Sequence, residues 1–157
     1  MGGTDAAALF DAVRARLAGH PRERLGEWAL SRRVLGFGRA PRIVPVGEAW
    51  HVGVLLIGDG AVYATAEVLR ARTEAVRGYT AQAQRERSER AAAAARGGFA
   101  DGEVLHLGFA AIDLAALARG EASGPLSLAG GIPHVRWSAT GAPRPLAAYL
   151  DEQLDLR

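Results

Sequence analysis

Hydrophobic residues near the N-terminus recur every three or four positions, at Leu9, Phe10, Val13 and Leu17. This spacing is typical of an amphipathic helix. Thr4 has a side chain suited to an N-cap, Asp5 stands in the first turn, and Gly19 follows as a stop. The pattern therefore predicts a helix over residues 5–18.

A second helix is predicted over residues 80–96. Arg85 with Glu89 and Glu86 with Arg90 form opposite-charge pairs at i,i+4 spacing. The apolar face consists almost only of alanine, so this helix either packs closely on a sheet or is largely solvated. Two glycines follow it and are expected to end it.

Two shorter helical patterns lie in the C-terminal half. Residues 112–118 predict a short helix with Asp113 in its first turn. Pro145 suits the first turn of a last helix that extends to about residue 154. Its expected apolar stripe is Leu146, Tyr149, Leu150 and Leu154.

Runs of β-branched and aromatic residues predict two hairpins. Residues 50–57 and 61–69 flank Gly58-Asp59-Gly60, and residues 126–128 and 132–138 flank Gly130-Gly131. Residues 103–109 predict a further strand. Residues 26–35 fit a strand or a short helix, and we favour the strand. Residues 36–48 predict an irregular crossing with a short extended piece at 42–46.

These elements define an α+β fold: a small, mostly antiparallel sheet built from hairpins and packed with about three helices. The length of 157 residues suits one domain, and we expect residues 1–157 to form a single domain. No internal repeat and no linker interrupts the pattern.

All 19 basic residues counted as Lys and Arg are arginine, and the chain has no cysteine. Without lysine there is no Schiff base, no phosphate-loop lysine and no Ser–Lys pair. Without cysteine there is no thiol nucleophile and no thiolate metal site. GC-rich codons explain this composition, and a selected need for guanidinium groups is the alternative. Any catalysis must use His, Asp, Glu, Ser, Thr or Tyr.

Charge is distributed unevenly along a chain whose net charge is +2. Residues 70–96 hold seven arginines and three glutamates, whereas residues 101–157 hold four arginines and seven acidic residues. This asymmetry could attract an anionic partner. It falls short of the basic face of a nucleic-acid binder, so we expect no nucleic acid.

The strongest apolar run, residues 52–57, is far too short to span a membrane. The N-terminus lacks both a basic leader and an apolar core of a signal peptide. We therefore expect a cytoplasmic protein without membrane contact.

Histidines within strands are the candidate acid–base groups. In residues 50–56 the alternation separates a Trp50 face from a His51 face, and in residues 132–138 it separates a Trp137 face from a face with His134 and Arg136. If the two strands are neighbours, the histidines converge, and a carboxylate such as Glu48 or Glu67 completes a catalytic group. The other interpretation is that these histidines bond to the backbone or are exposed.

Neither a metal nor a nucleotide cofactor is expected. A zinc site would need His51, His106 and His134, but no two of them have the spacing of a zinc motif. Gly36-Phe37-Gly38 lacks the third glycine of a dinucleotide fingerprint and does not clearly open a helix.

Arginines close to tryptophans are the candidate ligand-binding residues. Guanidinium groups hold carboxylates and phosphates through paired hydrogen bonds, and an aromatic side chain could form a wall beside them. The alternative is a solvated loop whose arginines pair with surface carboxylates. The candidate residues are Arg39, Arg42, Trp50, Arg136 and Trp137.

The segment from Arg39 to Leu56, RAPRIVPVGEAWHVGVLL, resembles a segment of short uncharacterised proteins from GC-rich bacteria. Residues 124–138 and 144–146 are similar to later parts of those proteins, so the resemblance covers most of the chain. Some of them carry a glutaminase label. Glutaminases use a Ser-x-x-Lys pair or a cysteine triad, and neither can exist here, so no residue role is transferred.

Taken together, the sequence predicts a cytoplasmic, non-enzymatic module that binds a small anion or a protein partner. Homodimerisation is plausible because short hairpin strands leave apolar faces that need cover. The alternative is a small hydrolase or other acid–base enzyme that uses His51, His134 and a carboxylate.

Overall fold

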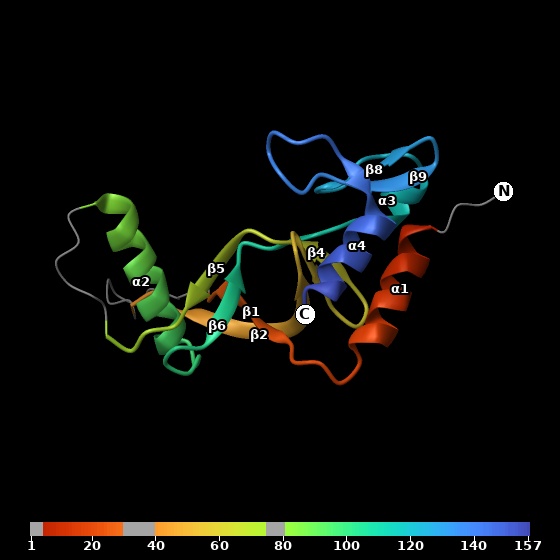
Figure 1. The fold of residues 1–157 in the computed structure, drawn as a ribbon. Coiled ribbons are helices and arrows are strands. Elements are labelled where there is room, and N and C mark those ends of the chain that lie inside the picture. Colours follow the sequence, from red (N-terminus) through yellow and green to blue (C-terminus); the bar gives the residue numbers. More distant parts are fainter. Residues whose placement is uncertain (1–4, 30–39, 75–80) are drawn as a thin grey trace. The chain divides into compact units, whose positions relative to one another are not determined.

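The structure, a computed structural model, describes residues 5–29, 40–74 and 81–157 (Figure 1). The chain divides into two compact units. The first unit comprises Met1–Arg22, Ala49–Thr65 and Ala110–Arg157, and the second comprises Glu23–Glu48 and Ala66–Phe109. Helices and strands occur in both, which confirms the α+β class. The single-domain interpretation stays a prediction.

The first unit contains the last residues of β2, two sheets and three helices. Its strands follow the antiparallel order β2-β3-β4-β7 in one sheet and β10-β9-β8 in the other. The elements are α1 (Ala6–Leu17), β2 (Ile43–Val52), β3 (Leu55–Ile57), β4 (Val62–Ala64), β7 (Ala110–Ala111), α3 (Leu114–Ala118), β8 (Leu126–Ala129), β9 (Ile132–Val135), β10 (Arg144–Pro145) and α4 (Leu146–Asp155).

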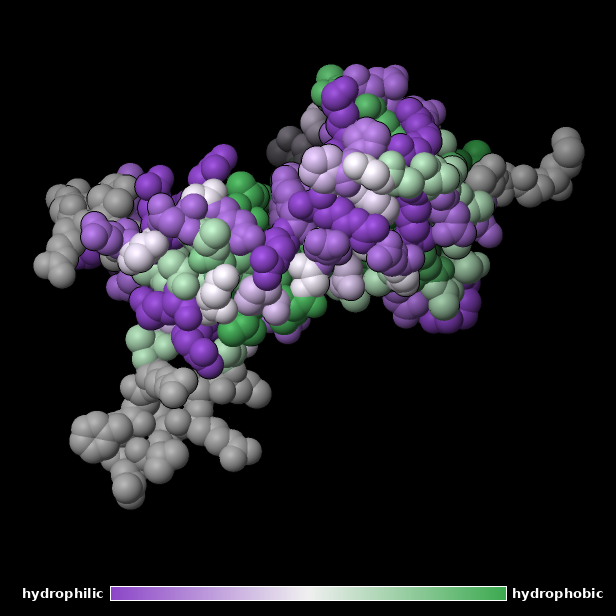
Figure 2. Space-filling view, turned by 90° about the horizontal axis from the view of Figure 1, so that it is seen from below, coloured by the Kyte–Doolittle hydropathy of each residue, from purple (hydrophilic) through white to green (hydrophobic). Residues whose placement is uncertain are grey.

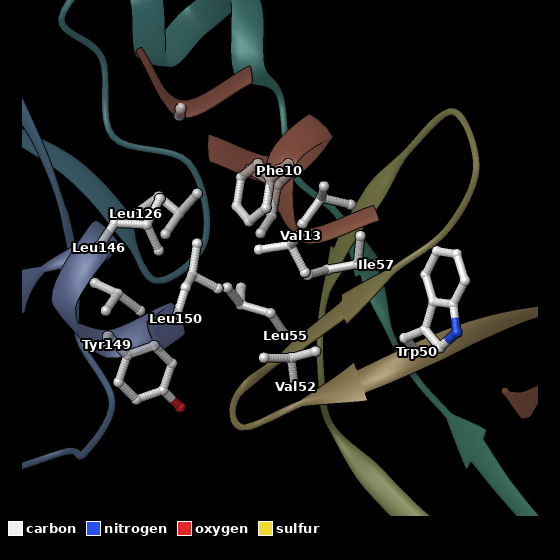
Figure 3. Packing of buried hydrophobic residues seen from close by; sticks show 14 of the residues in the cluster. Phe10, Val13, Trp50, Val52, Leu55, Ile57, Leu126, Leu146, Tyr149 and Leu150 are labelled. Carbon is white, nitrogen blue, oxygen red and sulfur yellow. The ribbon is translucent and has the colours of Figure 1, made fainter. Parts of the chain in front are cut away.

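The hydrophobic core of the first unit joins α1 and α4 to the strands (Figure 3). The stripes predicted for both helices are the buried faces, apart from Leu9, which is partly buried. Phe10 and Leu150 are among the least exposed side chains of the chain. The hairpin around Gly130-Gly131 forms as β8 and β9, although β9 ends at Val135 rather than at residue 138.

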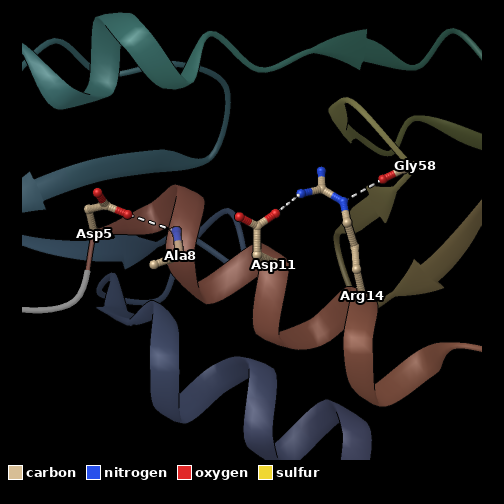
Figure 4. A network of polar contacts seen from close by, with 5 residues as sticks. All are labelled: Asp5, Ala8, Asp11, Arg14 and Gly58. Carbon is tan, nitrogen blue, oxygen red and sulfur yellow. Dashed lines mark hydrogen bonds and ion pairs between the residues drawn. The ribbon is translucent and has the colours of Figure 1, made fainter.

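Helix α1 begins at Ala6, one residue later than the start predicted from the sequence. The Ala8 backbone N–H donates to Oδ1 of Asp5 at 2.7 Å, so Asp5 is the N-cap (Figure 4). Thr4 lies outside the described residues. Further along the helix, Arg14 donates to Asp11 at 2.7 Å and to the Gly58 carbonyl at 2.7 Å. The Gly58 bond ties α1 to the β3–β4 turn.

The predicted strand over residues 50–57 is in fact a tight hairpin. Gly53 has a φ of +59°, and Val52 pairs with Leu55, so β2 and β3 run antiparallel. The Val54 backbone N–H donates to the Tyr149 hydroxyl at 3.0 Å. A Cβ at Gly53 would lie 1.9 Å from that hydroxyl oxygen. The predicted alternation of faces therefore ends at Gly53.

The turn at Gly58-Asp59-Gly60 is confirmed, with the Gly58 backbone N–H donating to the Ala61 carbonyl at 2.9 Å. The strand predicted after it is wrong in length, because residues 61–69 divide into β4 of the first unit and β5 of the second.

Asp59 in this turn provides a titration test. The hydrogen bond from Arg22, at 2.7 Å, lowers the pKa of Asp59 below its ordinary value, and the charges of Arg22 and Arg14 lower it further. A lowered carboxyl pKa favours folding above the unfolded-state pKa, and that contribution disappears as the pH falls through the folded-state pKa. We expect Arg22→Gln to raise the pKa of Asp59 in an NMR titration, and Arg14→Gln to raise it less. An unchanged Asp59 titration in Arg22→Gln would contradict this assignment.

The second unit has a mixed sheet with the strand order β5-β6-β1-β2. β1 runs parallel to β6, and β5 runs antiparallel to β6. The parallel pair was not predicted. The extended piece predicted at residues 42–46 is confirmed but longer than expected, because β2 begins at Ile43 and continues to Val52. Residues 36–39 of the predicted crossing lie outside the described residues. The elements besides β2 are β1 (Glu23–Trp28), β5 (Glu67–Arg70), α2 (Gln82–Arg96) and β6 (Val104–Leu107). β1 confirms the strand interpretation for residues 26–28, and residues 30–35 of that prediction lie outside the described residues.

Helix α2 packs closely on this sheet, which decides between the two alternatives for its alanine face. Residues 91–94 are buried, and Ala93 and Ala94 belong to a core with Leu69 and Leu105. Gly97 caps the helix, and a Cβ there would lie 1.6 Å from the Ile43 carbonyl oxygen. Small residues thus allow a helix to approach the sheet backbone closely.

Hydrophobic residues at the surface occur in small groups among hydrophilic ones in the face that Figure 2 shows. The large exposed apolar side chains include Trp28 and Trp137, about half exposed. No helix in the described segments has the length and apolar character needed to cross a membrane.

Candidate functional site

Trp50, predicted to form a ligand-binding wall, is a core residue of the first unit. Its side chain is 3% exposed, its Nε1 donates to the His20 carbonyl at 3.0 Å, and the Arg22 guanidinium lies 3.9 Å from the ring centre. Arg39 lies outside the described residues, and Arg42 belongs to the second unit. The grouping of these arginines with Trp50 stays a prediction.

The candidate catalytic histidines bond to backbone carbonyls close to themselves in sequence. The His51 ring contacts the Gly53 carbonyl at 2.9 Å, and the His134 ring contacts the Ile132 carbonyl at 2.8 Å. β2 and β9 belong to different sheets, so the neighbouring strands on which convergence depended are not found among the described residues. Glu48 is exposed in the second unit.

The second predicted pair of ligand-binding residues follows β9. Arg136 donates to the Gly141 carbonyl at 3.3 Å, and both Arg136 and Trp137 are exposed. Their role in binding a ligand stays a prediction.

A carboxylate–imidazole pair that the sequence analysis missed lies in the second unit. The fully buried His106 bonds through Nε2 to the carboxylate of Glu23, which remains partly exposed. The parallel pairing of β1 with β6, which sets Leu25 opposite His106, brings the two together. No local signal marks Glu23, because the pairing joins residues far apart in the sequence. The burial of His106 favours a role in holding the strands.

The clearest candidate site is a cavity of about 500 Å³ between β5 and α2, which we call the arginine cleft. Figure 1 shows the two elements beside each other, β5 in yellow-green and α2 in green. The residues that line the cleft include Arg70 from β5, Arg72 two residues beyond β5, and Arg87 from α2. Gln84 and Ser88 of α2 add polar groups, and none of the described residues that line the cleft is acidic.

All three arginines are exposed, and two of their guanidinium groups donate to backbone carbonyls. Arg87 Nη2 donates to the Val68 carbonyl at 3.1 Å, and Arg70 Nη1 donates to the Gly102 carbonyl at 3.2 Å. The Arg72 backbone N–H donates to the Ala91 carbonyl at 3.1 Å, while its guanidinium has no hydrogen bond to the described residues. Carbonyl partners fix the side chains without neutralising their charge.

Other arginines of the same unit show the contrast. Arg90 donates to Glu67 at 2.8 Å and Arg24 donates to Glu103 at 3.2 Å. These ion pairs neutralise their guanidinium groups. The three cleft arginines carry positive charge with no carboxylate bonded to them within the described segments, so the cleft is a concentration of uncompensated charge.

The sequence signal for this cleft was the basic stretch over residues 70–96. The sequence analysis connects this stretch with attraction of an anionic partner but assigns no binding site to it. The sequence did not show that β5, which ends at Arg70, and the segment after it bring Arg70 and Arg72 to the same cleft as Arg87 of α2.

No protein-family model matches the chain, and no curated protein or solved structure matches it either. The resemblance to short proteins of GC-rich bacteria therefore stays a prediction, and the candidate site depends on this structure's own geometry.

Proposed function

We propose that this protein is a non-enzymatic module that binds a small oxyanion in the arginine cleft. The observation that carries the proposal is the set of three arginines lining one cavity without an acidic residue among the described lining. The proposed ligand is still a small anion, as the sequence analysis expects. The proposed binding site changes from Arg39 and Arg42 to Arg70, Arg72 and Arg87.

The chemistry of the cleft suits an anion with several oxygens. Like charges in one cavity repel one another, and a bound anion removes that repulsion while accepting hydrogen bonds from the guanidinium forks. Arginine stays charged at every physiological pH, so binding does not depend on titration of the site. Both carboxylates and phosphates offer the required acceptor geometry.

Isothermal titration with inorganic phosphate and with malonate tests the proposal and separates the two oxyanion sources. We expect Arg87→Gln and Arg72→Gln each to weaken binding about tenfold, the loss of roughly one charge-assisted hydrogen bond. Arg85→Gln is the matched control, because it removes the same charge from α2 but does not line the cleft. Tighter binding of phosphate would assign a phosphate ligand, and tighter binding of malonate a carboxylate.

If Arg87→Gln and Arg85→Gln weaken anion binding equally, the effect comes from net charge alone and the assignment of the site is overturned. Absence of any measurable binding in the unmodified protein at low ionic strength would overturn the function itself, since screening is weakest there.

The rival function, a small acid–base enzyme, has one observation in its favour, the Glu23–His106 pair. Its histidine is fully buried, which leaves the ring without access to a substrate. We therefore favour the binding module. A cytoplasmic location and a homodimer are further parts of the proposal, and sedimentation equilibrium would test the dimer.

A further inference from the structure

A second cavity of about 460 Å³ lies in the second unit, where β1, β5 and β6 meet α2, and we call it the aromatic hollow. Two aromatic residues line it, Trp28 at the end of β1 and Phe109 beyond β6. Leu107, which is 7% exposed, contributes an apolar surface. Gly26 and Gly108 also line it. The hollow thus presents aromatic surface to whatever enters it.

The charges of the hollow are opposite to those of the arginine cleft. Glu27 and Glu67 line it together with Arg90. Arg90 directs both Nε, at 3.1 Å, and Nη2, at 2.8 Å, to the same oxygen of Glu67, so its charge is balanced within the wall. The second carboxylate, that of Glu27, leaves the described lining residues with a net negative charge.

We propose that the aromatic hollow binds a small organic cation, an alkylammonium group with apolar surface. The faces of Trp and Phe rings carry negative electrostatic potential and attract cations, most strongly in the case of Trp. The alkyl groups of such a cation cover Leu107 and the rings, while the charge lies near Glu27. An anion would meet both a carboxylate and the ring faces, so charge complementarity selects a cation.

The Trp28 side chain is 48% exposed, so its indole is accessible to a ligand rather than part of the core. This inference is independent of the proposed oxyanion function, because none of its residues lines the arginine cleft.

The experiment uses choline as the probe and 3,3-dimethylbutan-1-ol as its neutral counterpart of the same shape. Heat of binding and tryptophan fluorescence are followed in the full chain. We expect choline to bind and the neutral alcohol to bind at least about fivefold more weakly, the size of one cation–π contact. Equal binding of the two probes would overturn the proposal by showing that only apolar shape matters.

Two matched pairs of variants locate the site. Trp28→Leu is expected to weaken choline binding about fivefold or more, whereas Trp137→Leu, which removes a ring 47% exposed in the first unit, leaves it unchanged. Glu27→Gln weakens binding, and Glu48→Gln, on an exposed carboxylate of the same unit, does not.

Circular dichroism confirms that each variant is folded. Unchanged choline binding in folded Trp28→Leu, or equal losses in both glutamate variants, would overturn the assignment. Loss of phosphate binding with intact choline binding would separate failure of the proposed function from failure of this inference.

Discussion

Gly97→Ala is expected to destabilise the second unit by about 3 kcal/mol, the upper end for inserting atoms into a packed site. The added Cβ would lie 1.6 Å from the Ile43 carbonyl oxygen and 2.4 Å from its carbonyl carbon. Both neighbours are backbone atoms of β2, so neither can move aside by changing a rotamer. Helix α2 must shift away from the sheet, which opens the contacts of its buried alanines. Chemical denaturation gives the change in free energy of unfolding.

Gly60→Ala is the control for this substitution. A Cβ at Gly60 would meet no atom within 4 Å, and its backbone does not have a positive φ. We expect a change within about 0.5 kcal/mol. If Gly97→Ala lowers the free energy of unfolding no more than Gly60→Ala does, then α2 does not approach Ile43 as closely as described.

Phe10→Ala is expected to destabilise the first unit by about 4 kcal/mol. The ring is fully buried on α1 and packs in the core that includes Leu150 of α4 (Figure 3). Its removal loses the transfer free energy of the ring and leaves a cavity that the neighbours refill only in part. Leu156→Ala is the control, because that side chain is 76% exposed and its truncation should cost little. Equal effects of the two variants would contradict the described core.

The same two variants test the prediction of a single domain. If residues 1–157 unfold as one domain, Phe10→Ala and Gly97→Ala both lower the midpoint of a single unfolding transition. Signals that report on the first unit and on the second unit then change together. Separate transitions, each moved by only one of the variants, would show that the two units are independent domains.

The helices were predicted from the sequence because their signals are local. The stripe of α4 and the Gly97 stop of α2 depend on residues within a few positions of each other, and both are confirmed. The glycine-rich turns at residues 58–60 and 130–131 were also correct, because glycines between two strand-like runs are a local turn signal. The break at Gly53 was missed, because a glycine within a strand-like run is compatible with either a continuous strand or a turn. The contact with Tyr149 lies almost a hundred residues further along the chain.

The candidate site was likewise predicted only in part, because its charge is a local feature and its assembly is not. The basic stretch over residues 70–96 was visible as composition and predicted attraction of an anionic partner, but it did not show which arginines share one site. The approach of α2 to β5 converts that charge into a cleft with Arg70 and Arg72. Trp50 shows the converse, because a tryptophan beside arginines in the sequence is a core residue in the fold.

The sequence by itself determined the α+β class, the position of the main helices, the turns and the exclusion of lysine and cysteine chemistry. Periodicity, capping and turn residues act over a few positions, so one chain segment is enough to reveal them. Tertiary structure alone decided the parallel pairing of β1 with β6, the Glu23–His106 pair, and the charge and shape of the two cavities. Each of these joins segments that are distant in sequence, and their contact depends on how the strands and helices pack.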